Sequence, residues 1–222
     1  MFCTLLNLVL FISGPIVVEA AKVNKKGKTV KVDCGRVRGI YNVTSRAYSF
    51  RGIPYASPPV GNLRWRPPFP VNSTNKNCWR GRLNARKFGS PCLKEKPPFT
   101  ANTTIGNENC LYLNVWTPSL SRILVTRQQS SWLVTMMLSI INYRLNAFGF
   151  MSLDMLRVGS HTNTSGYYGF MDMLTGLHWV QNNIRQFGGD PNQVTPFGQS
   201  SGGTAIYALL ASPLGRGLFH KA

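Results

Sequence analysis

The last part of the chain alternates between two hydrophobic periods, which limits the folds open to it. Over residues 170–184 apolar side chains recur every three or four positions, as on one face of a helix. Residues 194–197 are typical of a short strand, and residues 204–211 follow a helical pattern that ends before Pro213. Strands that alternate with helices predict an α/β fold with a mostly parallel central sheet.

The preceding segments add strands and one ordered loop. Residues 29–41 predict a hairpin that turns at Cys34-Gly35, and residues 111–116 and 132–143 predict short strands. Residues 52–70 are rich in proline and glycine, with aromatic and aliphatic residues between them, which predicts an ordered loop.

The sequence Gly198-Gln199-Ser200-Ser201-Gly202 lies between the last predicted strand and the last predicted helix and fits the pattern G-x-S-x-G. In that setting the glycines allow a sharp turn that exposes the serine hydroxyl, as at a catalytic nucleophile. Ser200 is then the candidate nucleophile, and the backbone N–H of Ser201 is a candidate donor to an oxyanion. The alternative is a serine that only caps the helix after a glycine turn.

The N-terminus predicts entry into the secretory pathway. Residues 5–18 form an apolar stretch of signal-peptide length, so we expect a signal peptide over residues 1–20 and one domain over residues 21–222. A buried N-terminal element is the alternative. Cleavage would remove Cys3 and leave an even set of four cysteines, which suggests disulfides in a secreted protein. The sequence contains four Asn-x-Ser/Thr sequons, and the secretory route makes their asparagines glycosylation candidates: Asn42, Asn72, Asn102 and Asn163.

Composition excludes some classes of protein. The apolar share of the 222 residues is 43%, which excludes a disordered chain, and the body of the chain has no apolar run long enough for a multi-span membrane protein. The net charge is +18. Most of the charge is scattered and the route is secretory, so no nucleic-acid partner is expected. We interpret the one dense cluster as a solvated arm, with a weak polyanion contact as the alternative: Lys22, Lys25, Lys26, Lys28 and Lys31.

Four stretches occur in a characteristic order: residues 50–56 (FRGIPYA), 108–116 (ENCLYLNVW), 142–145 (NYRL) and 166–222, which contains FGGDP and the G-x-S-x-G motif. In this order they resemble the type-B carboxylesterase and cholinesterase family of α/β-hydrolases. The resemblance covers the N-terminal portion of a family member. It implies an incomplete α/β-hydrolase fold, with a mostly parallel central sheet and helices on both faces.

The resemblance also implies a function. That function is serine-dependent hydrolysis of small-molecule carboxylic esters through an acyl-enzyme on Ser200, with no cofactor and no metal. It further implies a disulfide between Cys92 and Cys110, which leaves Cys34 and Cys78 as a candidate second bridge. The loop between Cys92 and Cys110 has no Trp and one aromatic residue, Phe99, so a general carboxylesterase is favoured over a choline esterase.

The chain departs from the family pattern at the partners of the serine. In this fold the acid and the histidine follow the nucleophile, but residues 201–222 contain no Asp or Glu and one histidine, His220, which we expect on the surface. His161 and His178 precede Ser200. Asp172 and His178 are six positions apart, so we expect them on different faces of their helix.

Two further departures concern the oxyanion loop and the strand before the motif. No glycine occurs over residues 107–148, so the glycine-rich oxyanion loop is missing, and we expect a core strand to be missing with it. Pro196 lies where a strand residue would donate to the sheet. We therefore expect the chain as written to be inactive, as the N-terminal portion of a secreted serine esterase. The alternatives are a non-catalytic, cholinesterase-like adhesion or binding module, against which the intact Ser200 argues, and a short degenerate product.

Overall fold

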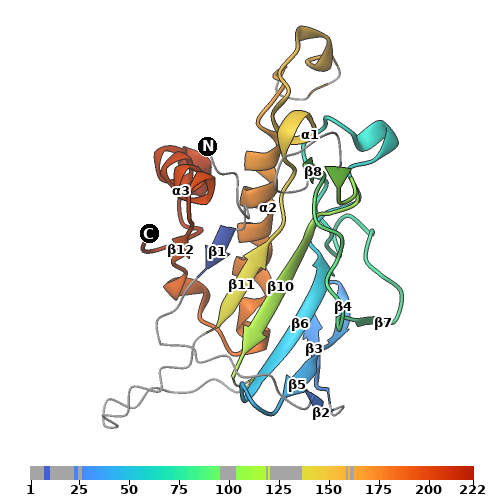
Figure 1. Cartoon of the computed structure of the whole chain (residues 1–222), viewed down its shortest axis with the longest axis vertical. Helices are drawn as coiled ribbons and strands as arrows, with labels where there is room; N and C mark the ends of the chain where they lie inside the picture. Colours follow the sequence, from blue (N-terminus) through green and yellow to red (C-terminus); the bar gives the residue numbers. More distant parts are fainter. Residues whose placement is uncertain are drawn as a thin grey trace.

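The residues that the structure describes form one large sheet, two small sheets and three α-helices (Figure 1). The computed structural model describes residues 8–10, 23–24, 27–95, 104–118, 120, 137–158, 160 and 163–222. The strands are β1 (Leu8–Leu10), β2 (Val23–Asn24), β3 (Thr29–Val32), β4 (Gly35–Arg38), β5 (Ile40–Asn42), β6 (Ala47–Pro54), β7 (Arg82–Asn84), β8 (Lys94–Glu95), β9 (Thr104–Ile105), β10 (Tyr112–Thr117), β11 (Leu138–Ile141) and β12 (Pro196–Phe197). The α-helices are α1 (Asn146–Phe150), α2 (Tyr168–Asn183) and α3 (Ser201–Ala211), joined by short 3₁₀ turns.

The large sheet has the strand order β12-β1-β11-β10-β6-β5-β2, and each neighbouring pair in it is antiparallel. The expected mostly parallel pairing is therefore wrong for the described strands. A parallel pair needs a long crossover, usually a helix, and among the described residues no α-helix precedes Asn146. The strands β11 and β12 do run in the same direction, because each is antiparallel to β1, and α2 lies between them in the chain.

The strand β1 falls inside the expected signal peptide. Its backbone pairs with β11 on one side and with β12 on the other. This arrangement corresponds to the alternative of an N-terminal element within the fold. The rest of residues 1–20 lies outside the described residues, so the signal peptide and its cleavage stay predictions.

The predicted loop over residues 52–70 begins inside a strand, β6, which is eight residues long. A β-bulge explains why the pattern hides this strand. Leu113 pairs with Ile53 and Val115 pairs with Phe50, so two residues of β6 lie opposite Asn114 alone. Gly52 supplies the positive φ of 69° at the bulge, and its N–H donates to Asn114 Oδ1 at 2.9 Å.

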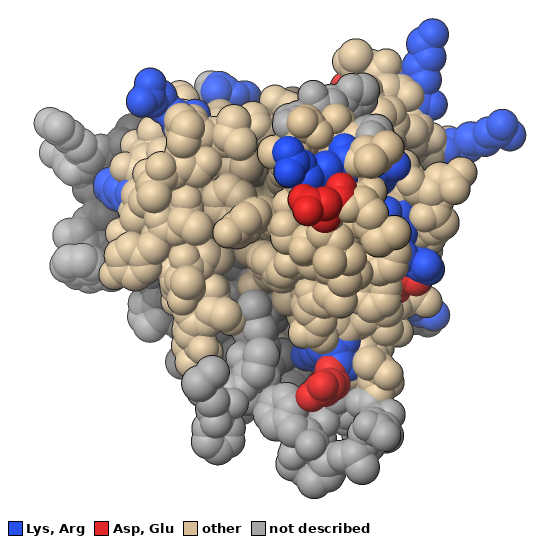
Figure 2. Space-filling view, turned by 90° about the horizontal axis from the view of Figure 1, so that it is seen from above, with Lys and Arg blue, Asp and Glu red and all other residues tan. Residues whose placement is uncertain are grey.

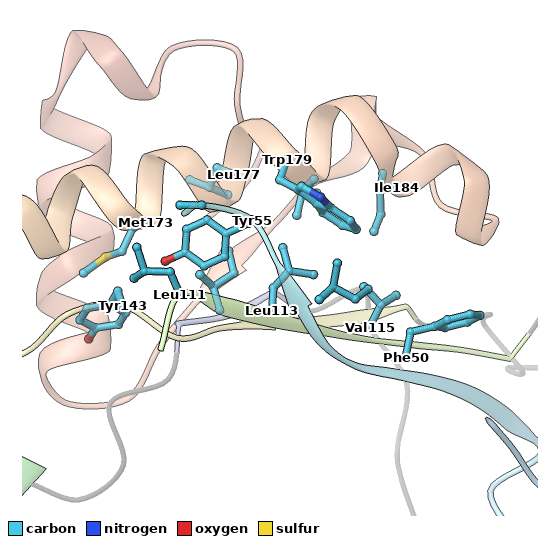
Figure 3. Packing of buried hydrophobic residues seen from close by; sticks show 14 of the residues in the cluster. Phe50, Tyr55, Leu111, Leu113, Val115, Tyr143, Met173, Leu177, Trp179 and Ile184 are labelled. Carbon is cyan, nitrogen blue, oxygen red and sulfur yellow. The ribbon is translucent and has the colours of Figure 1, made fainter. Parts of the chain in front are cut away.

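The main hydrophobic core lies between the large sheet and α2, which runs along one face of that sheet (Figure 3). Leu113 and Val115 of β10 and Leu177 of α2 are almost fully buried in it. The predicted helices agree with the structure: α2 spans the one from 170, and α3 the one from 204. The strands predicted over 111–116 and 194–197 correspond to β10 and β12. The strand β11 lies within the one predicted over 132–143, of which residues 132–136 are outside the described residues. The expected fold has helices on both faces of the large sheet. Among the described residues, α2 forms a layer on one face, so helices on the opposite face stay a prediction.

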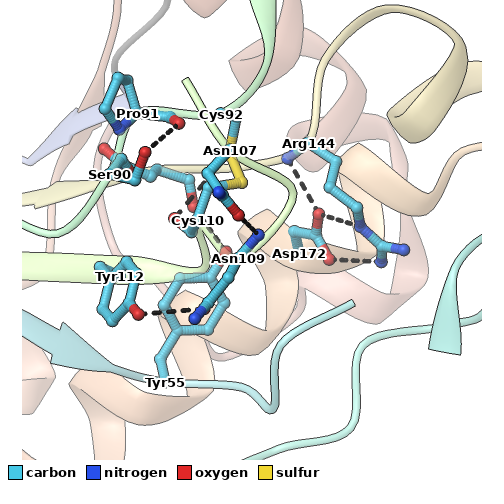
Figure 4. The surroundings of a disulfide bond; sticks show 11 residues. Tyr55, Ser90, Pro91, Cys92, Asn107, Asn109, Cys110, Tyr112, Arg144 and Asp172 are labelled. Atoms are coloured by element: carbon cyan, nitrogen blue, oxygen red, sulfur yellow. Dashed lines mark hydrogen bonds and ion pairs between the residues drawn. A yellow bond between two sulfur atoms is a disulfide. The ribbon is translucent and has the colours of Figure 1, made fainter. Parts of the chain in front are cut away.

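A buried ion pair joins the end of β11 to α2 (Figure 4). The guanidinium of Arg144 meets both carboxylate oxygens of Asp172, at 2.7 and 2.8 Å, and the Arg144 backbone N–H donates to the same carboxylate at 3.0 Å. The two side chains are 3% and 0% exposed. Burial raises the pKa of Asp172, and the contacts with Arg144 oppose that shift without cancelling it.

The predicted hairpin over residues 29–41 is confirmed as β3 and β4, which pair antiparallel. The strand β7 adds to β4 in parallel and completes a three-stranded sheet. A disulfide between Cys34 and Cys78 ties the β3–β4 turn to the segment before β7, with Cα atoms 5.0 Å apart. No helix within the described ranges is long and apolar enough to cross a bilayer.

Candidate active site

Ser200 lies in a sharp turn between β12 and α3, as the G-x-S-x-G pattern predicts. Its backbone has φ 58° and ψ −125°, a conformation that a residue with a Cβ rarely adopts and that is often found at functional sites. Gly198 makes the turn possible, because a Cβ on it would lie 2.4 Å from the carbonyl carbon of Gly202. The turn thus needs glycine where the motif has it.

The hydroxyl of Ser200 is not used to cap α3. Ser200 occupies the N-cap position, but its side chain makes no cap hydrogen bond. The residue is exposed. The alternative of a simple capping serine therefore does not fit the structure, and the hydroxyl is available for chemistry.

Ser201 is the first residue of α3, which is eleven residues long. The first N–H groups of a helix have no intrahelical acceptor, and the helix dipole favours negative charge there. Gly202 N–H is already engaged by Gln199 O at 3.0 Å. The backbone N–H of Ser201 therefore remains the better placed donor for an oxyanion formed beside Ser200.

No histidine or carboxylate of the described residues makes a hydrogen bond with Ser200. His220 is exposed, and its backbone N–H donates to Val194 O at 2.8 Å, which anchors it before β12, whereas Ser200 follows β12. His178 is exposed on α2, as expected, and Asp172 is engaged by Arg144. His161 lies outside the described residues.

Pro196 has a simple place in the structure. It is buried in β12, and β12 is the terminal strand of the large sheet. An edge strand can carry proline, because the N–H that proline lacks is needed only where a neighbour accepts it. The segment where the oxyanion loop would be sought, residues 121–136, lies outside the described residues.

A second disulfide, Cys92–Cys110, has Cα atoms 4.9 Å apart and lies near Asp172 and Arg144 (Figure 4). Both disulfide pairings therefore agree with the expectation. Arg64 and Glu108 form a two-pronged ion pair next to this bridge, and it holds the pKa of Arg64 above its usual value. Phe99, in the loop that the bridge closes, lies outside the described residues.

A cavity of about 250 Å³ lies away from Ser200, on the side of α2 that faces the β3–β4 turn. His178, Asp33 and Asn183 are among its lining residues, and Ser200 is not. Within the described part of the chain, no three His, Cys, Asp or Glu side chains are grouped as metal ligands would be.

Three of the four sequons fall on described residues. Asn42 Oδ1 accepts the backbone N–H groups of Thr44 and Ser45, and Asn72 Oδ1 accepts that of Asn75. These contacts use the amide oxygen and leave Nδ2, the atom that carries a glycan, directed elsewhere. Asn163 is exposed, and Asn102 lies outside the described residues.

Comparison with known proteins gives consistent results. The sequence profile of the Carboxylesterase family matches residues 26–140 and 127–222. The chain is 36% identical to fumonisin B1 esterase from Sphingopyxis macrogoltabida, with 96% of this chain and 42% of that protein aligned. It is 37% identical to juvenile hormone esterase from Tribolium castaneum, over 82% of this chain and 33% of the relative.

Solved structures agree with the sequence relatives. A PNB esterase superposes with a TM-score of 0.70 at 32% identity, over 88% of this chain and 43% of that structure. A Geobacillus stearothermophilus carboxylesterase gives a TM-score of 0.69 at 30% identity, over 86% and 42%. The chain thus spans about two fifths of the length of these proteins, and the fold is that of the α/β-hydrolases.

Proposed function

Because this chain belongs to the carboxylesterase family, we propose that Ser200 is the nucleophile of carboxylic ester hydrolysis. One observation carries the proposal: Ser200 has a strained backbone at a strand–turn–helix junction, and its exposed hydroxyl does not cap the helix. A residue held in such a conformation has a cost in stability that a purely structural serine would not need.

The proposed reaction is the one that membership of the carboxylesterase family implies. The Ser200 oxygen attacks the ester carbonyl carbon while a histidine base takes its proton, and the backbone N–H of Ser201 stabilises the resulting oxyanion. The C–O bond to the alcohol then breaks, and the alcohol leaves with that proton. Water attacks the acyl-enzyme in the same way and releases the acid. Small-molecule carboxylic esters are the proposed substrates.

The 222 residues alone are proposed to have no measurable esterase activity. The described residues bring no base to Ser200, and one oxyanion donor contributes about 10²- to 10³-fold in turnover. The test therefore joins this chain to the C-terminal part of the superposed PNB esterase, which supplies the acid and the histidine, and replaces residues 121–136 with the matching segment of that esterase, which supplies the oxyanion loop. The chimera should hydrolyse p-nitrophenyl acetate, and the 222-residue chain should not.

A fluorophosphonate probe identifies the nucleophile directly. Mass spectrometry of the labelled chimera should find the probe on Ser200, and Ser200→Ala should abolish both labelling and hydrolysis. Ser201→Ala is the matched control, because it keeps the backbone N–H and should retain most of the activity. A chimera that is folded by circular dichroism yet unlabelled at Ser200 contradicts the proposal.

The second candidate is a non-catalytic binding module. It is favoured by the lack of any described histidine or carboxylate bonded to Ser200. If this candidate is correct, Ser200→Ala leaves every property of the chimera unchanged.

The two disulfides suit an oxidising compartment, so secretion is part of the proposal, with glycans on Asn42, Asn72, Asn102 and Asn163. Expression in a secreting eukaryotic cell should give a product in the medium that becomes smaller after peptide N-glycosidase treatment. An Asn→Gln change at each sequon identifies the positions used.

A further inference from the structure

The outward face of the three-stranded sheet carries a row of positive charges. The strand register sets Lys31 directly opposite Arg36, and Arg36 directly opposite Arg82. All three residues are exposed, while the alternate positions, such as Val30 and Val37, are buried on the other face. Neighbouring strands are about 4.8 Å apart, so the row extends over about 10 Å.

Arg38 enlarges this row into a patch. It lies two positions from Arg36 on β4, on the same face, and pairs with Thr29 and Asn84, which are uncharged. The basic sheet face is defined here as Lys31, Arg36, Arg38 and Arg82. The three strands that carry it lie on the far side of the molecule from α3 (Figure 1), and Lys31 is itself a member of the lysine cluster singled out in the sequence. Lys28 of that cluster is exposed just before β3, and Lys22, Lys25 and Lys26 lie outside the described residues.

Among the described residues, no ion pair neutralises a side chain of this face. The ion pairs among the described residues are Arg64–Glu108, Arg144–Asp172 and Arg157–Asp154, and none of them includes a residue of the basic sheet face. The closest acid in the sequence is Asp33, in the β3–β4 turn, and its carboxylate accepts hydrogen bonds from the N–H and hydroxyl of Ser73. Like charges on directly opposed strand positions lower stability.

The backbone under this face is cross-linked. The Cys34–Cys78 disulfide closes one end of the sheet, and Trp79 Nε1 donates to the backbone oxygen of Arg36 at 3.3 Å. The strands therefore keep the basic positions in one row, which matches anions repeated along an extended chain. The wider surface is also basic, since Lys and Arg side chains outnumber Asp and Glu on the face shown in Figure 2.

We propose that the basic sheet face binds a sulfated polysaccharide. Charge complementarity calls for a linear polyanion. The choice of a glycan over a nucleic acid rests on the secretion proposed above, which the two disulfides suit. This binding is independent of the ester chemistry, because the face and Ser200 are on different parts of the molecule.

The test measures binding of a heparin octasaccharide by titration calorimetry at two salt concentrations. Lys31→Thr/Arg36→Thr/Arg82→Thr should bind about ten-fold more weakly than the wild type, because three surface ion pairs are lost. The matched control, Arg185→Gln/Arg216→Gln/Lys221→Gln, removes three exposed charges elsewhere and should change the affinity less than two-fold. The single variant Arg36→Thr, in the middle of the row, should show a smaller loss of the same sign.

Three results overturn the proposal: no binding by the wild type, equal losses in the two triple variants, or tighter binding to a DNA oligonucleotide of equal charge or to phosphatidylserine vesicles than to heparin. Unchanged unfolding curves of the variants confirm that the fold is intact. Ser200→Ala should bind heparin as the wild type does, so failure of the esterase proposal and failure of this one are separable.

Discussion

Two regions of the molecule differ in how much of their surface other residues cover. The α2 region consists of β6, β10, β11 and α2. The elbow region consists of β12 and α3. Ten of the sixteen residues of α2 are buried, against three of the eleven residues of α3. The α2 region also contains the buried Arg144–Asp172 pair. On α3, in contrast, Tyr207 is 76% exposed and Leu210 is 54% exposed.

This difference teaches that the stability of the fold and the geometry of the candidate nucleophile come from separate sets of contacts. The α2 region packs its apolar side chains internally, and the buried charge of Arg144 is paired with Asp172. The elbow region has a strained serine, an edge strand and an apolar helix face open to solvent. An exposed apolar face beside an edge strand favours association, so we expect the chain to be poorly soluble on its own.

The largest effect is expected from Asp172→Asn in the α2 region. The substitution leaves the Arg144 charge buried without a full counter-charge, which costs about 3–5 kcal/mol of the free energy of unfolding. Urea unfolding measures it. Asp154→Asn is the control, because the Arg157–Asp154 pair is exposed and is worth at most about 1 kcal/mol. Equal losses would show that the buried pair does not stabilise the α2 region.

The next largest losses of stability are expected when either disulfide is removed. Cys34→Ser/Cys78→Ser opens a bridge with a sequence separation of 44, and Cys92→Ser/Cys110→Ser one with a separation of 18. The entropy of loop closure predicts losses of about 4 and about 3 kcal/mol in the free energy of unfolding. A larger loss for the shorter loop would show that contacts around Cys92 and Cys110, and not chain entropy, decide the result.

A moderate effect is expected in the elbow region from Gly198→Ala. The new Cβ would overlap the backbone of Gly202, which costs about 1–3 kcal/mol and moves Ser200 out of position. Gly203→Ala is the matched control, because its nearest atom, Gly198 O, is 3.4 Å away and alanine favours a helix by about 0.5–1 kcal/mol. Thermal unfolding of the two variants gives the comparison, and a stable Gly198→Ala would mean that the turn does not need glycine.

The smallest effect on stability is expected from Leu210→Gln on the exposed face of α3. It should change the free energy of unfolding by less than about 0.5 kcal/mol and raise the concentration at which the protein stays monomeric. Leu209→Ala, one position away but 1% exposed, should cost about 2–5 kcal/mol. Light scattering and urea unfolding separate the two outcomes, and a costly Leu210→Gln would mean that the α3 face is covered.

The sequence predicted those elements whose pattern is strictly periodic. The helical period from Phe170 and the alternation of β3 and β4 are regular, so both were located correctly. The end of β6, residues 52–54, was interpreted as part of a loop because the bulge places Phe50 and Ile53, three positions apart, both in the core. A period of two cannot reveal a strand that is interrupted in this way.

The sequence also predicted one part of the candidate site and missed other features of the structure. The glycines of the motif predicted the turn at Ser200, since only small residues fit a backbone that folds back on itself. The antiparallel direction of the sheet was not predicted, because pattern shows that a strand is buried and not which way its neighbour runs. The alignment of Lys31, Arg36 and Arg82 was also hidden, because it depends on strand register across 51 positions of sequence, from Lys31 to Arg82.

The orientation of Ser200 depends on few groups of the sheet. Pro196 offers no N–H, and β12 is only two residues long, so little sheet hydrogen bonding extends to the turn. The close approach of the Gly198 and Gly202 backbones and the first turn of α3 hold the serine instead. Substitutions in the walls of a binding site would leave this local geometry unchanged, which allows selectivity for the acid or alcohol part of an ester to diverge while the attacking oxygen stays in place.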